Sequence, residues 1–368
     1  MKKTIKFILT MGLCVSMFAV NITMAFADEV NVMTTIPSNV EELSPELQAY
    51  YNALAAMSPE EIANVLNALN EQAQAIAKEQ EQAKKEAELT KNLNTAVNAT
   101  TSEVNPWARS EILGDANTGE IIYNLNGFEK LMPASTTKIL TTLLVVEAIE
   151  RGQINLDTEV EITKNMLARI PYDASTIKPK FKVGEKINVF GLLLADMVSS
   201  DCAACDILGE VVSGSVPEFV KLMNQRAAQL GCIDSNFTEP SGYPRDNHYT
   251  NAYSLFLITR EALKHEMFRN LMGCRQIVIP PTNKTGERNI TNTNKLLSNS
   301  IYFNPYCIGG KTGTSNDAGE CLVSVGAKDG KTVIAVVLGT KTVSAPDGTK
   351  VEPRYTESNR LLKMGLGY

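Results

Sequence analysis

A serine and a lysine three residues apart stand at the start of a long apolar helical stretch. Residues 133–138 read Pro-Ala-Ser-Thr-Thr-Lys, and the run 139–149 that follows is apolar on nearly every face, which predicts a buried helix. Residues three apart share a helix face, so we expect Ser135 and Lys138 to lie together. A serine hydroxyl becomes a nucleophile when a neighbouring base takes its proton, and a neutral lysine amine is such a base. The spacing therefore predicts nucleophilic catalysis at Ser135.

The same spacing occurs a second time, at Ser175 and Lys178. Pro179 follows that lysine directly, and the residue before a proline is disfavoured in a helix. No helix is expected to continue from this copy. We therefore assign the chemistry to Ser135 and treat the second copy as a coincidence.

A second chemical element lies near the C-terminus, in the run Gly-Gly-Lys-Thr-Gly-Thr at 309–314. Lys311 offers a positive charge, Thr312 a hydroxyl, and Gly313 lets another backbone come close. We expect this run to form an edge strand. A strand edge can bind an extended peptide through its free backbone groups.

The elements that position these residues are short strands at both ends of a helical region. Apolar runs at 111–113 and 121–123 flank Asn117-Thr118-Gly119, and runs at 321–327 and 332–338 flank Lys328-Asp329-Gly330. Both patterns are typical of β-hairpins. The sequence therefore predicts one α+β domain, with an antiparallel sheet formed by both chain ends and a helical subdomain between them.

These motifs and their surroundings resemble a known family. The pairing of Ser-Thr-Thr-Lys at Ser135 with Lys-Thr-Gly-Thr at Lys311 resembles the penicillin-binding proteins and serine β-lactamases. The flanking stretches 115–140, 239–260 and 309–339 look like serine-type D-alanyl-D-alanine carboxypeptidases of low molecular mass, of the peptidase S11 type. The resemblance covers about residues 106–368. It implies the transpeptidase fold of penicillin-binding proteins and removal of the terminal D-alanine from peptidoglycan stem pentapeptides. It also implies covalent inhibition by β-lactam antibiotics, without a cofactor or a metal.

The resemblance also implies a role for each motif residue. Ser135 would form the acyl ester, and Lys138 would be its general base. Lys311 and Thr312 would hold the substrate's terminal carboxylate, while the backbone N–H groups of Ser135 and Thr314 would form the oxyanion hole.

The family's third motif, Ser-x-Asn, is expected about 60 residues after the nucleophile, which points to Ser199-Ser200-Asp201. Ser199 would relay a proton to the leaving amine. Asp201 departs from the family's asparagine, and an ionised carboxylate accepts hydrogen bonds but donates none. A carboxylate beside Lys138 would also raise the pKa of that lysine, whereas burial would favour a protonated Asp201 that can donate. We hypothesise an enzyme that is competent but slower, or shifted in its pH optimum.

Other functions remain open at this stage. One is a peptidoglycan DD-endopeptidase on the same fold. Another is a catalytically weakened envelope protein that binds a partner. A class A β-lactamase would carry a Glu-x-x-Leu-Asn loop, and no match to it occurs between Asp201 and Lys311.

The net charge of −6 on 368 residues belongs to one segment. Residues 28–105 hold 13 acidic residues and 4 lysines, whereas residues 106–368 hold 28 of each sign. A nucleic-acid surface, which needs clustered basic residues, is not expected. Ser58-Pro59 begins a helical pattern that runs to Thr90, so we expect 28–105 to be an acidic helical spacer. It is either a solvated linker or an arm for an unknown partner.

Residues 1–27 have the pattern of a secretory signal peptide. Lysines begin the chain, Phe7 to Val20 is mostly apolar, and Ala25-Phe26-Ala27 fits a cleavage site. We expect an exported, extracytoplasmic protein that is associated with the cell wall or secreted. The sequence leaves open how the cysteines of the mature chain pair, and we expect free buried thiols. Its two histidines are too few and too badly spaced for a metal site.

Overall fold

The computed structural model describes residues 107–344 and 347–368 without a break, and the stretch 71–105 in part. The chain divides into two compact units, residues 1–88 and 89–368. In the first unit, every described residue from Glu71 to Glu88 is helical and exposed, in agreement with the expected helix. The expected signal peptide and the spacer up to residue 70 lie outside the described residues.

The second unit is built on a five-stranded antiparallel sheet with the strand order β2-β1-β9-β8-β7. The strands are β1 (Ser110–Asp115), β2 (Ile121–Leu125), β7 (Cys307–Ser315), β8 (Gly319–Lys328) and β9 (Lys331–Thr340). Both expected hairpins are present, as β1–β2 and β8–β9. β1 pairs with β9 from Ser110 opposite Leu338 to Asp115 opposite Val333, so both ends of the domain share one sheet, as expected.

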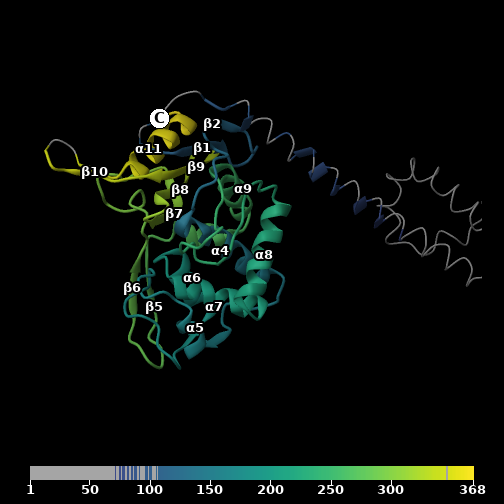
Figure 1. Cartoon of the computed structure of the whole chain (residues 1–368), viewed down its shortest axis with the longest axis vertical. Helices are drawn as coiled ribbons and strands as arrows, with labels where there is room; N and C mark the ends of the chain where they lie inside the picture. Colours follow the sequence, from purple (N-terminus) through teal and green to yellow (C-terminus); the bar gives the residue numbers. More distant parts are fainter. Residues whose placement is uncertain are drawn as a thin grey trace, which may run out of the picture. The chain divides into compact units, whose positions relative to one another are not determined.

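Both faces of this sheet are covered, which explains why its central strand β9 is apolar from Val333 to Leu338. Val333, Ala335 and Val337 pack in one core with the final helix α11 (Pro353–Leu366). Ile334, Val336 and Leu338 belong to the larger core on the opposite face, which α9 (Ala252–Ala262) covers. Figure 1 shows α11 on one side of β1, β8 and β9, with α9 and the other helices on the other side.

The helical part is arranged around α4 (Lys138–Glu150), the buried helix that the sequence predicts. α4 contacts α6, α7, α8, α9 and α10, and its Leu143 and Val146 are wholly shielded from solvent. The remaining helices are η3 (Ala134–Thr137, one 3-10 turn), α5 (Lys164–Ala168), α6 (Val189–Met197), α7 (Cys202–Ser213), α8 (Val216–Gln229) and α10 (Glu266–Gly273). Within the described residues, no helix is long and apolar enough to span a membrane.

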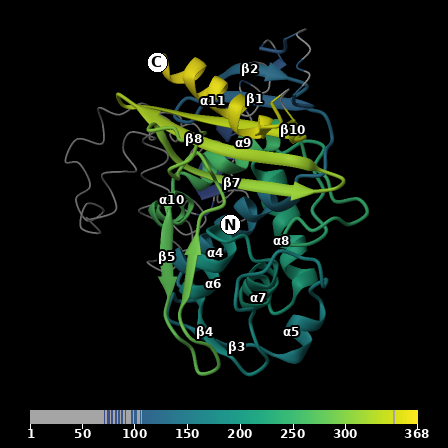
Figure 2. The same ribbon diagram turned by 90° about the vertical axis from the view of Figure 1, so that its left-hand side faces the viewer.

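Three small two-stranded sheets complete the unit. They pair β3 (Glu159–Glu161) with β4 (Lys186–Asn188), β5 (Gln276–Ile279) with β6 (Arg288–Thr291), and β10 (Val343–Ser344) with β11 (Lys350–Val351). The β5–β6 hairpin extends alongside the helical part (Figure 2).

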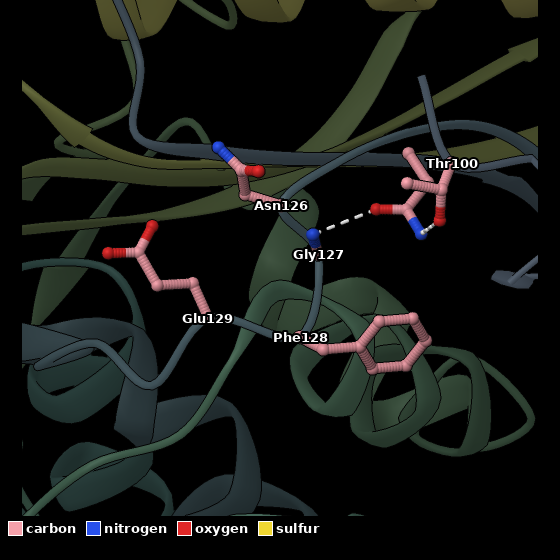
Figure 3. Close-up of a pocket in the computed structure, with 6 residues that line it drawn as sticks. Thr100, Asn126, Gly127, Phe128 and Glu129 are labelled. Carbon is pink, nitrogen blue, oxygen red and sulfur yellow. Dashed lines mark hydrogen bonds between the residues drawn. The ribbon is translucent and has the colours of Figure 1, made fainter. Parts of the chain in front are cut away.

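The folded unit starts earlier than the expected boundary at residue 106. The side-chain amide of Asn124 on β2 donates to the Ala96 carbonyl at 2.8 Å and to Thr100 Oγ1 at 3.0 Å. Thr100 and Gly127, with their neighbours, line a surface cavity of about 320 Å³ (Figure 3). The end of the expected spacer is therefore part of the folded unit.

Candidate active site

Ser135 and Lys138 lie together at the start of α4. The Lys138 ammonium donates to Ser135 Oγ at 3.1 Å and to the backbone carbonyl of Ser241 at 2.5 Å. Lys138 is fully buried, whereas Ser135 is partly exposed, so a substrate can reach the hydroxyl from outside. The expected juxtaposition of serine and lysine is confirmed.

The turn that presents Ser135 is held between two glycines from other parts of the chain. Ala134 has a positive φ of 47°, a conformation that a residue with a side chain rarely adopts. A Cβ on Gly242 would lie 1.8 Å from the Ala134 carbonyl oxygen, and one on Gly313 would lie 3.1 Å from the Ser135 nitrogen. Only glycines allow this close packing against the turn.

Lys311 reaches the same site from β7, the last strand of the sheet. Its ammonium is fully buried and donates to Ser200 Oγ at 2.9 Å and to the Thr312 carbonyl at 3.0 Å. The hydroxyl of Thr312 pairs with that of Thr293 at 2.5 Å. The expected edge position of this strand is confirmed, and Figure 2 shows β7 along the border between the sheet and the helices.

Thr314 lies farther along β7 and is held by α11. Its hydroxyl donates to the Gly313 carbonyl at 2.8 Å and accepts from Arg354 at 2.8 Å. Arg354 thus brings a further cation to this end of β7, and nothing in the sequence pattern pointed to it.

Of the two adjacent serines expected at the second motif, Ser200 and not Ser199 lies against Lys311. Ser199 follows the helix α6, and its hydroxyl donates to the carbonyl of Ala195 in that helix at 2.8 Å. Ser200 is the residue that contacts Lys311, and it does so with a positive φ of 64°. The residue two positions later is Cys202, whose sulfur lies 3.6 Å from the Lys138 nitrogen.

Asp201 does not contact either lysine through a hydrogen bond in the described structure. It caps α7, because one carboxylate oxygen accepts from the backbone N–H of Ala204 and the other from that of Ile177, both at 2.7 Å. Burial raises the pKa of Asp201 to about 6, although these two backbone donors and the charge of Lys138 oppose the rise. Both oxygens are committed to backbone groups, so the residue is structural in this arrangement.

The two buried lysines have opposite pKa shifts. Burial lowers the pKa of Lys311 to about 7, and the positive charge of Lys138 lowers it further. Burial also disfavours the charged form of Lys138, but neighbouring thiol and carboxyl groups outweigh this effect and raise its pKa. These shifts disfavour two charged lysines in the site at the same time. When only one of them is protonated, it is Lys138.

Two carboxyl groups lie near Lys138, on the buried Asp196 and the half-buried Glu239. Asp196 accepts from Thr142 and Cys205, each at 2.7 Å, and burial raises its pKa. Glu239 accepts from the hydroxyl of Ser241 at 2.6 Å and from two backbone N–H groups, which fixes the loop behind Lys138. Neither residue was predicted as part of the site, because each needs the folded chain to reach it.

His248 is buried close to this group but holds no charge. Burial and the charge of Lys138 lower its pKa to about 4. Its Nδ1 accepts from the Thr238 N–H at 3.1 Å, so the proton lies on Nε2, 3.0 Å from Thr137 Oγ1. The imidazole is engaged on both sides and does not reach Ser135 through any hydrogen bond of the described residues.

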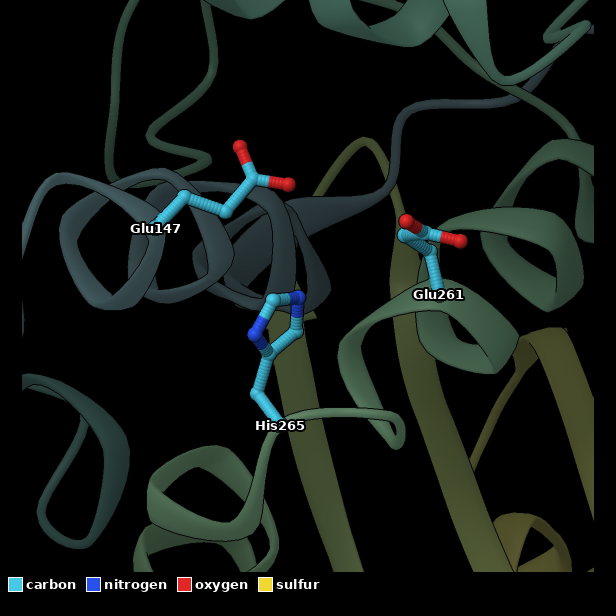
Figure 4. A group of neighbouring side chains, drawn as sticks. All are labelled: Glu147, Glu261 and His265. Atoms are coloured by element: carbon cyan, nitrogen blue, oxygen red, sulfur yellow. The ribbon is translucent and has the colours of Figure 1, made fainter. Parts of the chain in front are cut away.

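A separate group of side chains has the spacing of a metal site. Ligand atoms of Glu147, Glu261 and His265 lie within 4.8 Å of one another (Figure 4). The Arg226 guanidinium donates to Glu147 at 2.6 Å and to Glu261 at 2.9 Å, and His265 pairs with Glu150 at 2.7 Å. An ion-pair network between α4, α8 and α9 accounts for this group.

Comparison with protein families finds a match over most of the second unit. Residues 94–342 match the model of a family described as D-alanyl-D-alanine carboxypeptidase, peptidase S11. Among curated relatives, the carboxypeptidase DacF of Bacillus subtilis is 34% identical over 242 residues, which make up 66% of this chain and 60% of DacF. A D-alanyl-D-alanine endopeptidase of Escherichia coli is 27% identical over 246 residues, covering 66% of this chain and 75% of the relative.

Solved structures share the fold. A mutant of the Streptomyces K15 DD-transpeptidase superposes with a TM-score of 0.63 and 26% identity, covering 72% of this chain and all of that one, at 100%. Penicillin-binding protein 5 of Haemophilus influenzae gives a TM-score of 0.62 and 28% identity, covering 72% of each chain. The expected fold class is confirmed.

Proposed function

Because the chain belongs to the D-alanyl-D-alanine carboxypeptidase family, peptidase S11, we propose that it removes the terminal D-alanine from peptidoglycan stem pentapeptides. The observation that carries this proposal is the group of Ser135, Lys138, Ser200 and Lys311 beside the outer edge of β7, with Ser135 partly exposed and both lysines buried. It combines a hydroxyl nucleophile, an amine base, a proton relay and a cation for a carboxylate.

The substrate binds as an added strand on β7. The outer edge of a sheet offers free backbone groups that an extended peptide can pair with. The terminal carboxylate is held by Lys311 and by the hydroxyl of Thr312, which lies on the same strand. A carboxylate beside Lys311 favours its ammonium form, and a second ammonium at Lys138 is then disfavoured. Substrate binding thus helps Lys138 to become the neutral base.

Acylation follows from this arrangement. Lys138 takes the proton of Ser135, whose oxygen attacks the carbonyl carbon of the penultimate D-alanine. The backbone N–H groups of Ser135 and Thr314 stabilise the resulting oxyanion. The carbon–nitrogen bond then breaks, and D-alanine leaves with a proton that Lys138 returns through a hydroxyl group.

We assign that relay to Ser200 rather than Ser199, because Ser200 lies 2.9 Å from the Lys311 ammonium. Water then hydrolyses the ester and regenerates Ser135. By the same assignment, we infer that Cys202 rather than Asp201 takes the place of the family's asparagine. Both carboxylate oxygens of Asp201 bind backbone N–H groups, so Asp201 acts on Lys138 through its charge and not through a hydrogen bond.

The direct test is labelling with a fluorescent penicillin, followed by a measurement of D-alanine release from a pentapeptide. The wild type should be labelled and should release D-alanine, whereas Ser135→Ala should do neither. Absence of label on the folded wild type would overturn the proposal and would favour the partner-binding alternative.

A peptidoglycan endopeptidase is the second candidate, because one relative of similar coverage carries that name. Both activities cleave a bond after a D-alanine and use the same acyl enzyme. Release of cross-linked muropeptides as monomers, at a rate above that of D-alanine release, would identify the endopeptidase.

We also propose that the chain is exported, with residues 1–27 as its signal peptide, and that it acts outside the cytoplasm at the cell wall. The family supports this, because its relatives are named for D-alanyl-D-alanine substrates. N-terminal sequencing of the mature protein should begin at Asp28. We assign no partner to the acidic spacer.

A further inference from the structure

Two cysteines form a close pair on the first turn of α7, inside the proposed active site. Cys202 is the first residue of this helix, and Cys205 lies three positions later. Both are free and buried. Both match the free buried thiols expected from the sequence, but their contacts differ from those of the other cysteines.

Cys202 faces a cation. The Lys138 nitrogen lies 3.6 Å from its sulfur, and the residue occupies the N-terminal end of a helix. The sulfur of Cys202 is thus the one that contacts the catalytic lysine directly.

Cys205 faces a carboxylate. Its sulfur lies 2.7 Å from Asp196 Oδ1 and 3.0 Å from the Asp201 carbonyl. Burial raises the pKa of this thiol well above its usual value, and burial also raises the pKa of Asp196. A carboxylate with a raised pKa is a better proton acceptor, so Asp196 is placed to take the proton from a thiol that does not ionise by itself.

Three of the other four described thiols contact backbone carbonyls instead. Cys232 contacts the Ser254 carbonyl, Cys307 the Gly309 carbonyl and Cys321 the Ala318 carbonyl. No side-chain contact with a lysine or a carboxylate is recorded for these three among the described residues.

We propose that Cys202 and Cys205 are a redox-sensitive pair whose reversible disulfide lowers the activity of the site. This inference rests on the proposed function, because the activity concerned is acylation of Ser135. The oxidant is a small disulfide such as oxidised glutathione.

The chemistry proceeds in two exchanges. Cys202 attacks one sulfur of the small disulfide, forms a mixed disulfide and releases one thiol, which carries away the proton of Cys202. Cys205 gives its proton to Asp196 and attacks the Cys202 sulfur, which expels the second small sulfur group as a thiolate. This thiolate takes up the proton from Asp196 and leaves as the second thiol. Two protein thiols are oxidised to one disulfide, and one small disulfide is reduced to two thiols.

Closure of the disulfide has a direct geometric effect on the site. Residues three apart on a helix have Cβ atoms about 5–6 Å apart, and a disulfide brings them to about 4 Å. The first turn of α7 must therefore tighten, which moves the Cys202 sulfur toward Cys205 and away from Lys138. Ser200 lies two residues before Cys202 and moves with it, which alters its contact with Lys311.

The first measurement is independent of activity. The folded full chain is incubated with oxidised glutathione, the remaining thiols are alkylated, and the peptides are analysed by mass spectrometry. We expect an internal disulfide between Cys202 and Cys205, with the other thiols alkylated. In Cys205→Ala, the reaction should stop at a mixed disulfide of Cys202 with glutathione. If both residues stay alkylatable in the folded wild type, the proposal is wrong.

The second measurement is the rate of fluorescent penicillin labelling at Ser135. Oxidation should lower this rate about tenfold, the size expected when one hydrogen bond to a charged group is lost, and dithiothreitol should restore it. Cys232→Ala, which changes a thiol outside the site, should respond as the wild type does. An internal disulfide without any change in rate would overturn the switch. Absence of label on the reduced protein would instead contradict the proposed function, while the mass measurement would still decide whether the pair forms.

Discussion

Ser200 holds a conformation that most residues avoid, and that conformation turns its hydroxyl toward Lys311. Its φ of 64° lies in the left-handed region, where a residue with a Cβ is strained by roughly 1–2 kcal/mol. Asp201, the next residue, begins the cap of α7. The contact with Lys311 and the N-cap of α7 hold Ser200 in this unfavourable conformation. Such strained residues are typical of functional turns.

Replacing the two neighbouring serines should therefore give different results. Ser200→Ala removes the hydroxyl beside Lys311, and we expect penicillin acylation to slow by about 10²-fold, the lower range for loss of a proton relay. Ser199→Ala removes only a hydroxyl that bonds Ala195, and its rate should stay near that of the wild type. Stopped-flow measurement of the penicillin labelling rate in both variants tests this expectation. Equal losses in the two variants would contradict the assignment.

Lys311 gives the site a predictable response to pH. A base with a pKa of about 7 is charged below that pH and neutral above it. The affinity for a substrate carboxylate should therefore fall, and KM for the pentapeptide should rise, as the pH increases through about 7. Lys311→Arg keeps its charge at all these pH values, so its KM should be higher overall but flat with pH. A wild-type KM that is constant from pH 6 to 9 would contradict this expectation.

At the residue scale, the sequence identified the parts that depend on local spacing. Ser135 and Lys138 lie three apart on one helical turn, and Lys311 lies in a distinctive glycine-rich strand. Ser200 was missed because two serines are adjacent and Asp201 resembles the asparagine of the motif. The preference of aspartate for the helix N-cap was the signal that could have corrected the register.

The elements meet at the turn that carries Ser135. The loop after α8 contacts η3 through Gly242, and the strand β7 contacts it through Gly313. Gly242 is the more constrained of the two, since it has a φ of 79° and its hydrogen atom faces the Ala134 carbonyl.

Gly242→Ala tests this contact against a matched control. A Cβ there would lie 1.8 Å from the Ala134 oxygen, so the turn must move and acylation of Ser135 should fall at least tenfold, about 1.4 kcal/mol in the barrier. Gly214→Ala introduces the same strain, at a φ of 75°, but nothing lies within 4 Å. Both variants should lose about 1 kcal/mol of stability from the unfavourable φ. Only Gly242→Ala should lose activity per folded molecule. Urea titration gives the folded fraction of each variant, and the rate of penicillin labelling is then expressed per folded molecule. Equal activity in both would show that the turn tolerates the displacement.

The elements themselves were largely predictable, because both hairpins and the buried α4 have clear local patterns. Their contacts were not. The loop 239–242 reaches Lys138 only after α8 and α9 have packed on α4, and no periodicity in the sequence encodes that approach. The small sheet β5–β6 was also not predicted individually, since its strands span only Gln276–Ile279 and Arg288–Thr291.

At the scale of the whole molecule, the two ends of the domain are joined by a partly buried ion pair. Glu111 on β1 is fully buried and accepts from Arg360 on α11 at 2.5 Å. Arg360 also pairs with Glu357 at 2.7 Å, and Asn105 donates to both carboxylates. Burial raises the pKa of Glu111 to about 7, in spite of the neighbouring arginine.

Arg360→Ala should destabilise the domain by up to about 3 kcal/mol, because it leaves Glu111 buried without its cation. The loss depends on pH. Arg360 lowers the pKa of Glu111, so its removal raises that pKa further above 7. The loss from this charge is therefore small below about pH 7, where Glu111 is protonated in both folded proteins, and grows as the pH rises above 7. Urea unfolding at several pH values measures this. Lys186→Ala, which breaks an exposed pair with Glu159, should cost less than about 1 kcal/mol. A loss for Arg360→Ala that does not vary with pH would contradict the explanation.

The pairing of β1 with β9 also determines when the site can assemble during synthesis and folding. Ser110 can meet Leu338 only after nearly the whole chain has been synthesised, since strands from both ends must be present before the sheet can close. Contacts this distant in sequence form slowly, because a long loop must close first. The helices that carry Ser135 and Ser200 can form earlier, but Lys311 joins them only with β7. A chain that has not been synthesised beyond β7 therefore has no assembled site.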